Sequence, residues 1–159
     1  MKTVILYASS HGASAEVADW LAAQLGDADV INLKKQAVPN LALYDTVIVG
    51  GSIHMGRMQG TVRKLIETHA GELVSKRLGL YVCCMFEGET AQKQLEDAYP
   101  QGLRDAAVAT GLLGGTFDFD RMGFMEKVIV KKVSGVTESV SRLNREAMMR
   151  FVETMKGTQ

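Results

Sequence analysis

The stretch Thr3–Val17, TVILYASSHGASAEV, joins an apolar run to a loop of small polar residues and then to the start of a helical pattern. Thr3–Tyr7 is rich in branched apolar residues, which is typical of a parallel strand covered on both faces. The loop Ala8–Ser14 contains three hydroxyls and one glycine. In open α/β sheets, ligands bind beyond the carboxyl ends of the strands, so this loop is a candidate ligand site.

The rest of the chain repeats the alternation of strand and helix. Further strands are expected at Asp29–Leu33, Thr46–Val49, Leu78–Cys84 and, more weakly, Leu112–Phe117. Helices are expected at Ser14–Leu25, around Val62–His69, from Thr90 to Ala109 with a break at Pro100, and over Val140–Met155. This alternation predicts right-handed crossovers and one doubly wound parallel sheet with helices on both faces. No repeat or linker divides the 159 residues, so a single domain, 1–159, is expected.

Composition excludes several classes of function. The 18 Lys and Arg balance the 18 Asp and Glu, so no net charge points to nucleic acid. No apolar stretch approaches the length of a membrane span, and no signal peptide is recognised at the N-terminus. The adjacent Cys83 and Cys84 are expected to be free thiols in a reducing cytoplasm. They lack the Cys-x5-Arg of a small phosphatase, and no metal site is predicted.

The loop after the first strand has the features of an anion site. Backbone N–H groups at a helix N-terminus attract negative charge, hydroxyls add donors, and Gly12 permits a tight turn. A simple helix-capping turn at Ser14 explains the same residues equally well. The loop is neither a P-loop nor a dinucleotide fingerprint, because both the Gly-Lys-Ser/Thr and the G-x-G-x-x-G patterns are absent.

The run Tyr7–Ala18 resembles the phosphate loop of flavodoxins, Ser/Thr-x-Thr-Gly-Asn-Thr followed by Glu and an apolar residue. Ser9, Gly12, Ser14 and Glu16 match this pattern, whereas His11 and Ala13 depart from it. The resemblance implies a flavodoxin-like five-stranded sheet in the order 2-1-3-4-5 and a bound FMN. It places the FMN phosphate against the loop residues Ser9, Ser10, His11, Gly12, Ala13 and Ser14.

Two further loops follow later strands. The second, Gly50–Met58, opens with Gly50-Gly51-Ser52, which is expected to let backbone amides approach a flat ring. It is similar to the Gly-x-Ser-Ile-x-x-Gly loop of the menaquinone-dependent protoporphyrinogen oxidases, a branch of the flavodoxin family. The third is Met85–Glu89, in which Phe86 could stack on the flavin ring. By this resemblance the ring is flanked by Ser52, Ile53, His54, Met55, Gly56, Phe86, Glu87 and Gly88. For His54, an ordinary exposed loop histidine is an equal alternative.

An apolar and basic segment, about 118–137, precedes the last helical pattern. A similar insertion occurs in the same oxidase branch, with a comparable Lys-x-x-Ser-Gly ending. One interpretation is a surface helix packed on the domain; the other is a docking element for a quinone, a redox partner, the membrane surface or a second copy of the chain. The membrane contact would use residues 121–133.

These observations lead to three hypotheses. The first is an FMN-dependent oxidoreductase similar to the quinone-linked protoporphyrinogen oxidases, cytoplasmic or peripheral to the inner face of the membrane. The second is a flavodoxin-type electron carrier, which the balanced charge disfavours because such carriers are usually acidic. The third is an interaction module without cofactor, which the hydroxyl-rich loop disfavours. No residue is an obvious acid or base, so none is predicted to be catalytic.

Overall fold

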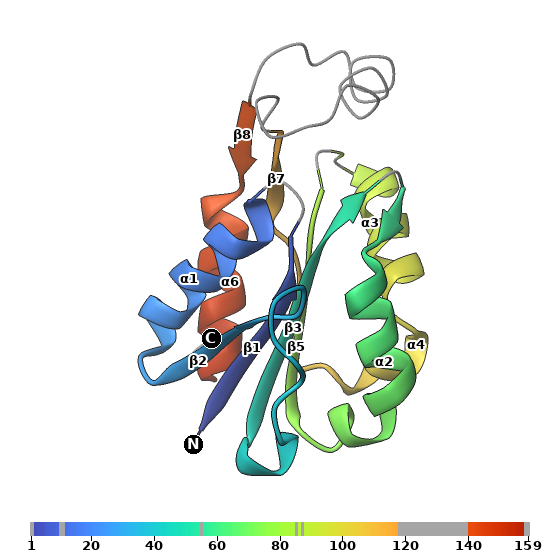
Figure 1. Cartoon of the computed structure of the whole chain (residues 1–159). Coiled ribbons are helices and arrows are strands. Elements are labelled where there is room, and N and C mark those ends of the chain that lie inside the picture. Colours follow the sequence, from blue (N-terminus) through green and yellow to red (C-terminus); the bar gives the residue numbers. More distant parts are fainter. Residues whose placement is uncertain are drawn as a thin grey trace.

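Figure 1 shows a computed structural model of the chain, in which a twisted sheet lies between two layers of helices. The structure describes residues 2–9, 12–54, 56–84, 86, 88–117 and 140–157. The insertion expected at about 118–137 lies outside the described residues, so its two interpretations stay predictions. Among the described residues, the longest helix has 14 residues, and no helix is long and apolar enough to cross a membrane.

The elements alternate along the chain as expected. The strands are β1 (Thr3–Ala8), β2 (Ala28–Asn32), β3 (Thr46–His54), β4 (Arg57–Met58), β5 (Arg77–Cys83), β6 (Ala109–Leu112), β7 (Gly114–Phe117) and β8 (Val140–Leu143). The helices are α1 (Ala13–Leu25), the short 3-10 turn η1 (Leu41–Leu43), α2 (Gly60–Leu73), α3 (Gly88–Ala98), α4 (Gln101–Ala106) and α6 (Arg145–Lys156).

The main sheet has the strand order β2-β1-β3-β5-β6, with the two-residue β4 paired to β3. The five strands of this path are parallel, and they are the first to fifth parallel strands in sequence order. The order is therefore 2-1-3-4-5, and the predicted flavodoxin-like topology is confirmed.

Each face of the sheet has its own core because its strands are apolar on both sides. On one face, α1 and α6 pack through side chains such as Val17, Leu21 and Phe151. On the other, α2, α3 and α4 pack through side chains such as Val62 and Leu95. Figure 1 shows the two groups of helices on opposite sides of the strands.

Several predicted boundaries are wrong. The helix expected to continue to Ala109 ends at Ala106, and Ala109 begins β6. The expected fifth strand, Leu112–Phe117, is divided between β6, which is parallel to β5, and β7, which turns away and pairs with β8. Residues 140–143, expected as the start of the last helix, form β8, and α6 begins only after Asn144 caps it. The pairing of β7 with β8 joins residues that are 23 to 29 positions apart, which local periodicity does not reveal.

Candidate functional site

The three predicted loops begin at one edge of the sheet, because the carboxyl ends of β1, β3 and β5 lie side by side. Ala8 pairs in register with Gly51, and Ser52 pairs with Cys83. The chain leaves β1 toward β2 and returns to β3 on the other side, so the strand order reverses between β1 and β3. This is the switch point at which open α/β sheets bind ligands.

The first loop leads into the N-terminus of α1, a place that suits an anion. Gly12 is the N-cap of α1, with a left-handed φ of 96° that favours glycine. Its N–H donates to the Ser9 hydroxyl oxygen at 2.9 Å, and its carbonyl accepts the first helical bond, from the Glu16 N–H. The N–H groups of residues 13–15 therefore have no partner within the helix. Together with the helix dipole, they suit a phosphate group.

The Ser14 side chain faces inward from this loop. It is fully buried, and its Oγ lies 2.7 Å from Oγ of Ser52 on β3. Tyr81 on β5 donates from its hydroxyl to the Ser14 backbone carbonyl at 3.1 Å. The first turn of α1 is thus hydrogen-bonded to the ends of two neighbouring strands.

The second loop is a β-hairpin in which Ile53 pairs with Met58 and His54 with Arg57. Gly56 makes the turn with a left-handed φ of 80°. The Gly50-Gly51 pair before it was expected to let backbone amides approach a flat ring. Instead, both glycines lie inside β3: a Cβ at Gly50 would overlap the Tyr81 ring, and one at Gly51 would stand 2.5 Å from Sδ of Met58. These two positions make room for the protein's own side chains.

The third loop leaves one large aromatic side chain accessible. Phe86 is 39% exposed at the end of β5, where an apolar ring surface suits stacking on a flavin. Gly88 opens α3 with a left-handed φ of 64°. The Cys84 thiol donates weakly to the Phe86 carbonyl, with sulfur and oxygen 3.7 Å apart.

The two cysteines are buried free thiols, as predicted. Burial raises the pKa of Cys83 to about 12, and a hydrogen bond with the Ser14 side chain acts in the opposite direction. Burial also raises the pKa of Cys84. Neither thiol is present as the reactive thiolate near neutral pH.

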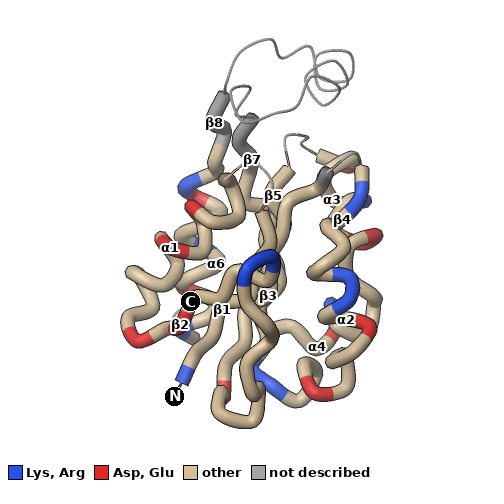
Figure 2. The backbone as a smooth tube through the Cα atoms, in the orientation of Figure 1, with Lys and Arg blue, Asp and Glu red and all other residues tan. Residues whose placement is uncertain are grey.

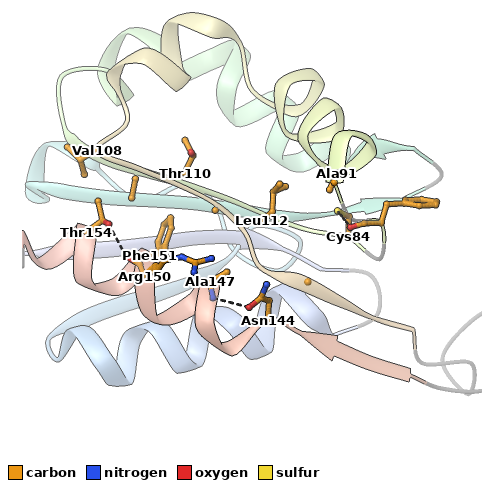
Figure 3. Close-up of a pocket in the computed structure, with 15 residues that line it drawn as sticks. Cys84, Ala91, Val108, Thr110, Leu112, Asn144, Ala147, Arg150, Phe151 and Thr154 are labelled. Atoms are coloured by element: carbon orange, nitrogen blue, oxygen red, sulfur yellow. Dashed lines mark hydrogen bonds between the residues drawn. The ribbon is translucent and has the colours of Figure 1, made fainter. Parts of the chain in front are cut away.

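A groove of about 780 Å³ runs beside β6, the last strand of the main sheet, and reaches the third loop at Cys84 and Phe86 (Figure 3). Asn144 and Arg150 of the α6 segment line its other wall. Sequence reasoning did not single out these two residues. These residues lie beside β6 only because the sheet order places β6 at the edge of the main sheet. Local periodicity in the sequence does not reveal that order.

The structure brings together seven of the predicted site residues at this sheet edge: Ser9, Gly12, Ala13, Ser14, Ser52, Ile53 and Phe86. Gly56 and Gly88 shape the turns of the second and third loops. Ser10, His11, Met55 and Glu87 lie outside the described residues, as does the side chain of His54. Their contacts with a flavin stay predictions.

A doubly wound parallel sheet in the order 2-1-3-4-5, with its switch point between β1 and β3, is the flavodoxin-like arrangement of α/β proteins. The chain belongs to the flavodoxin domain family, whose profile matches residues 4–144. It is 30% identical over 154 residues to the protoporphyrinogen IX dehydrogenase [quinone] of Escherichia coli strain K12, an alignment that covers 87% of this chain and 84% of that protein.

Solved structures agree on the fold. A short-chain flavodoxin associated with a non-canonical PDU bacterial microcompartment superposes with a TM-score of 0.61 at 15% identity, over 99% of this chain and 97% of that one. A Fusobacterium nucleatum flavodoxin bound to flavin mononucleotide superposes with a TM-score of 0.56 at 12% identity, over 98% and 95% of the two chains. These likenesses show the flavodoxin-like fold of the chain.

Proposed function

We propose that this protein binds FMN without covalent attachment and is an oxidoreductase that delivers electrons to a quinone. The observation that carries the proposal is the first turn of α1, where three N–H groups without helical partners follow left-handed Gly12 at the switch point of the sheet. A relative named for a quinone-linked dehydrogenase supports the choice of acceptor.

The described residues fit FMN in two parts. The amides of residues 13–15 would hold the phosphate, and the Ser9 hydroxyl, which accepts from Gly12, keeps its own hydrogen to donate to it. Ser52, Ile53 and Phe86 would flank the ring at the ends of β3 and β5. The flavin supplies the redox chemistry when bound, while these residues position it and exclude water. A single phosphate-sized loop favours FMN over FAD.

The substrate is proposed to be a porphyrinogen, as the name of the Escherichia coli relative suggests. The quinone, or the membrane that contains it, is proposed to meet the apolar and basic segment 121–133. Within that segment, Lys127 and Lys131 would each add about 1 kcal/mol of attraction to an anionic lipid surface, a contribution that salt weakens.

Reconstitution with FMN tests the cofactor. The purified protein, incubated with FMN and desalted, should retain flavin absorption near about 375 and about 450 nm. A protein that stays colourless and retains no FMN would refute the proposal. Turnover of protoporphyrinogen with and without a quinone then tests the reaction.

Three substitutions test the segment 121–133: Phe124, Val128 and Ile129 to Ser. FMN binding should persist, since no flavin loop is changed, whereas electron transfer to a quinone should fall much more than transfer to a small soluble dye. Liposome flotation at low and high salt measures the lipid contact directly. If the triple variant binds FMN and reduces quinone at the parent's rate, the segment does not dock the acceptor.

A flavodoxin-type carrier without its own substrate is the alternative. The equal numbers of acidic and basic residues, 18 each, argue against it, because carriers of this kind dock through strongly acidic surfaces. In Figure 2 the two signs are scattered over the described helices and loops. Reduction of a quinone by the protein together with porphyrinogen turnover distinguishes an oxidoreductase from a carrier.

A further inference from the structure

Ser14 sits at the centre of a small buried polar cluster. Its hydroxyl oxygen is 2.7 Å from that of Ser52. The Ser14 side chain also lowers the pKa of the Cys83 thiol, against the larger effect of burial. The residue has no solvent-exposed surface. The Ser14 hydroxyl is therefore not available to an anion at the helix terminus unless the side chain leaves this cluster.

The cluster connects all three loops of the candidate site. Ser14 belongs to the first turn of α1, Ser52 leads into the hairpin of the second loop, and Cys83 ends β5 just before the third loop. Ser52 and Cys83 are also register partners in the sheet. The Ser14–Ser52 hydrogen bond thus joins the phosphate subsite to the second loop, and the pairing of Ser52 with Cys83 joins the second loop to the end of β5.

Tyr81 also holds the first turn of α1 in place. Its ring is fully buried over Gly50, and its hydroxyl donates to the Ser14 carbonyl at 3.1 Å. Its own backbone carbonyl accepts from the Tyr99 hydroxyl at 2.8 Å. Both the side chain and the main chain of Ser14 are therefore held by β3 and β5, which leaves the first turn of α1 little freedom to shift.

We propose that Ser14 and Ser52 are positioning residues that couple the phosphate subsite to the ring subsite of the flavin site, rather than ligands that act separately on the two ends of the cofactor. Their hydrogen bond sets the spacing between the α1 terminus and the second loop. The inference rests on the proposed FMN binding. It predicts that removing either hydroxyl weakens recognition of the phosphate, even though Ser52 lies on the ring side.

Comparison of FMN with riboflavin measures this coupling, because riboflavin lacks the phosphate. Dissociation constants for both flavins would be determined by fluorescence quenching for the parent, Ser14→Ala, Ser52→Ala and the double variant. Each single change should reduce the preference for FMN over riboflavin about fivefold, the usual size of one hydrogen bond. The double variant should show the same reduction as either single variant, since both remove one shared interaction.

Two control variants separate positioning from a general loss of stability. Ser52→Thr keeps the hydroxyl and should keep the parent's preference for FMN. Ser75→Ala removes a hydroxyl that bonds only to the end of α2, through the Glu72 carbonyl, and should leave both dissociation constants unchanged. Circular dichroism confirms that each variant is folded.

Other patterns overturn the inference. If Ser14→Ala reduces the preference and Ser52→Ala does not, Ser14 is a direct phosphate ligand. If Ser52→Ala weakens both flavins equally, Ser52 is only a ring contact, and additive effects in the double variant would likewise exclude coupling. If the parent binds neither flavin, the proposed function is wrong, and the proposed coupling is wrong as well. If the parent binds FMN but the variants do not show the expected pattern, only the coupling is wrong.

Discussion

Gly50→Ala tests the packing that holds the candidate site together. A Cβ on Gly50 would overlap Cζ and both Cε atoms of Tyr81, so the ring would have to move. It has little room to do so, because Tyr81 is fully buried and packs edge-to-face on Phe151 with ring centroids 6.1 Å apart. Moving the ring would also break its hydrogen bond to the Ser14 carbonyl.

The expected cost has two parts. Overpacking of a close-packed core costs about 1–3 kcal/mol, and a buried hydroxyl left without its partner costs about 1–3 kcal/mol. Gly50→Ala should therefore lower the free energy of unfolding by about 2–6 kcal/mol, a large part of the roughly 5–15 kcal/mol typical of a domain. The variant should also bind FMN more weakly, because the first turn of α1 loses its support from Tyr81.

Urea unfolding followed by circular dichroism measures the effect. Gly71→Ala is the matched control: Gly71 lies in α2 with open space where a Cβ would stand, so alanine should stabilise the protein by about 0.5–1 kcal/mol. In a Tyr81→Ala background, Gly50→Ala should cost little, because the opposing ring is gone. A loss below about 1 kcal/mol in the parent, under the lower bound for overpacking, would show that the Tyr81 ring does not lie over Gly50.

Three further predictions concern single residues. Gly12→Val should abolish FMN binding while circular dichroism stays unchanged, because a branched residue opposes the left-handed φ of 96° at the α1 terminus; binding equal to the parent's would place the phosphate elsewhere. Because burial raises the pKa of Cys83 from 9.0 to about 12, its neutral form stabilises the fold below about pH 9 and that stability is lost as pH rises toward 12. Urea unfolding at several pH values should show this decline, and Cys83→Ala should reduce its slope. Arg77 donates to the Met155 carbonyl at 3.0 and 3.1 Å and to that of Thr154 at 3.2 Å, at the end of α6. Arg77→Ala should lower the free energy of unfolding by about 1.5–3 kcal/mol, and Arg77→Lys, which lacks the planar fork, should restore only part of it; an unchanged urea midpoint would contradict the pairing.

The sequence alone was enough to predict the class of fold. Runs such as Thr3–Tyr7 and Thr46–Val49 are apolar on both faces, which a strand between two helical layers satisfies. The loop around Gly12 could also be recognised as a candidate anion site, because the first N–H groups of any helix have no partner within the helix. Periodicity and loop composition depend on neighbours in the chain, so a single sequence displays them directly.

Tertiary structure decided how these parts are used. Gly50 and Gly51 were interpreted as an opening for a flavin ring, yet they accommodate Tyr81 and Met58, which come from elsewhere in the chain. Residues 140–143 have a helical pattern, yet they pair with β7. Ser14 occupies a phosphate-binding position of the flavodoxin loop pattern, yet its hydroxyl hydrogen-bonds with that of Ser52, 38 positions away. Each of these outcomes depends on a contact between distant segments, and such contacts exist only once the sheet order has brought the strand ends together.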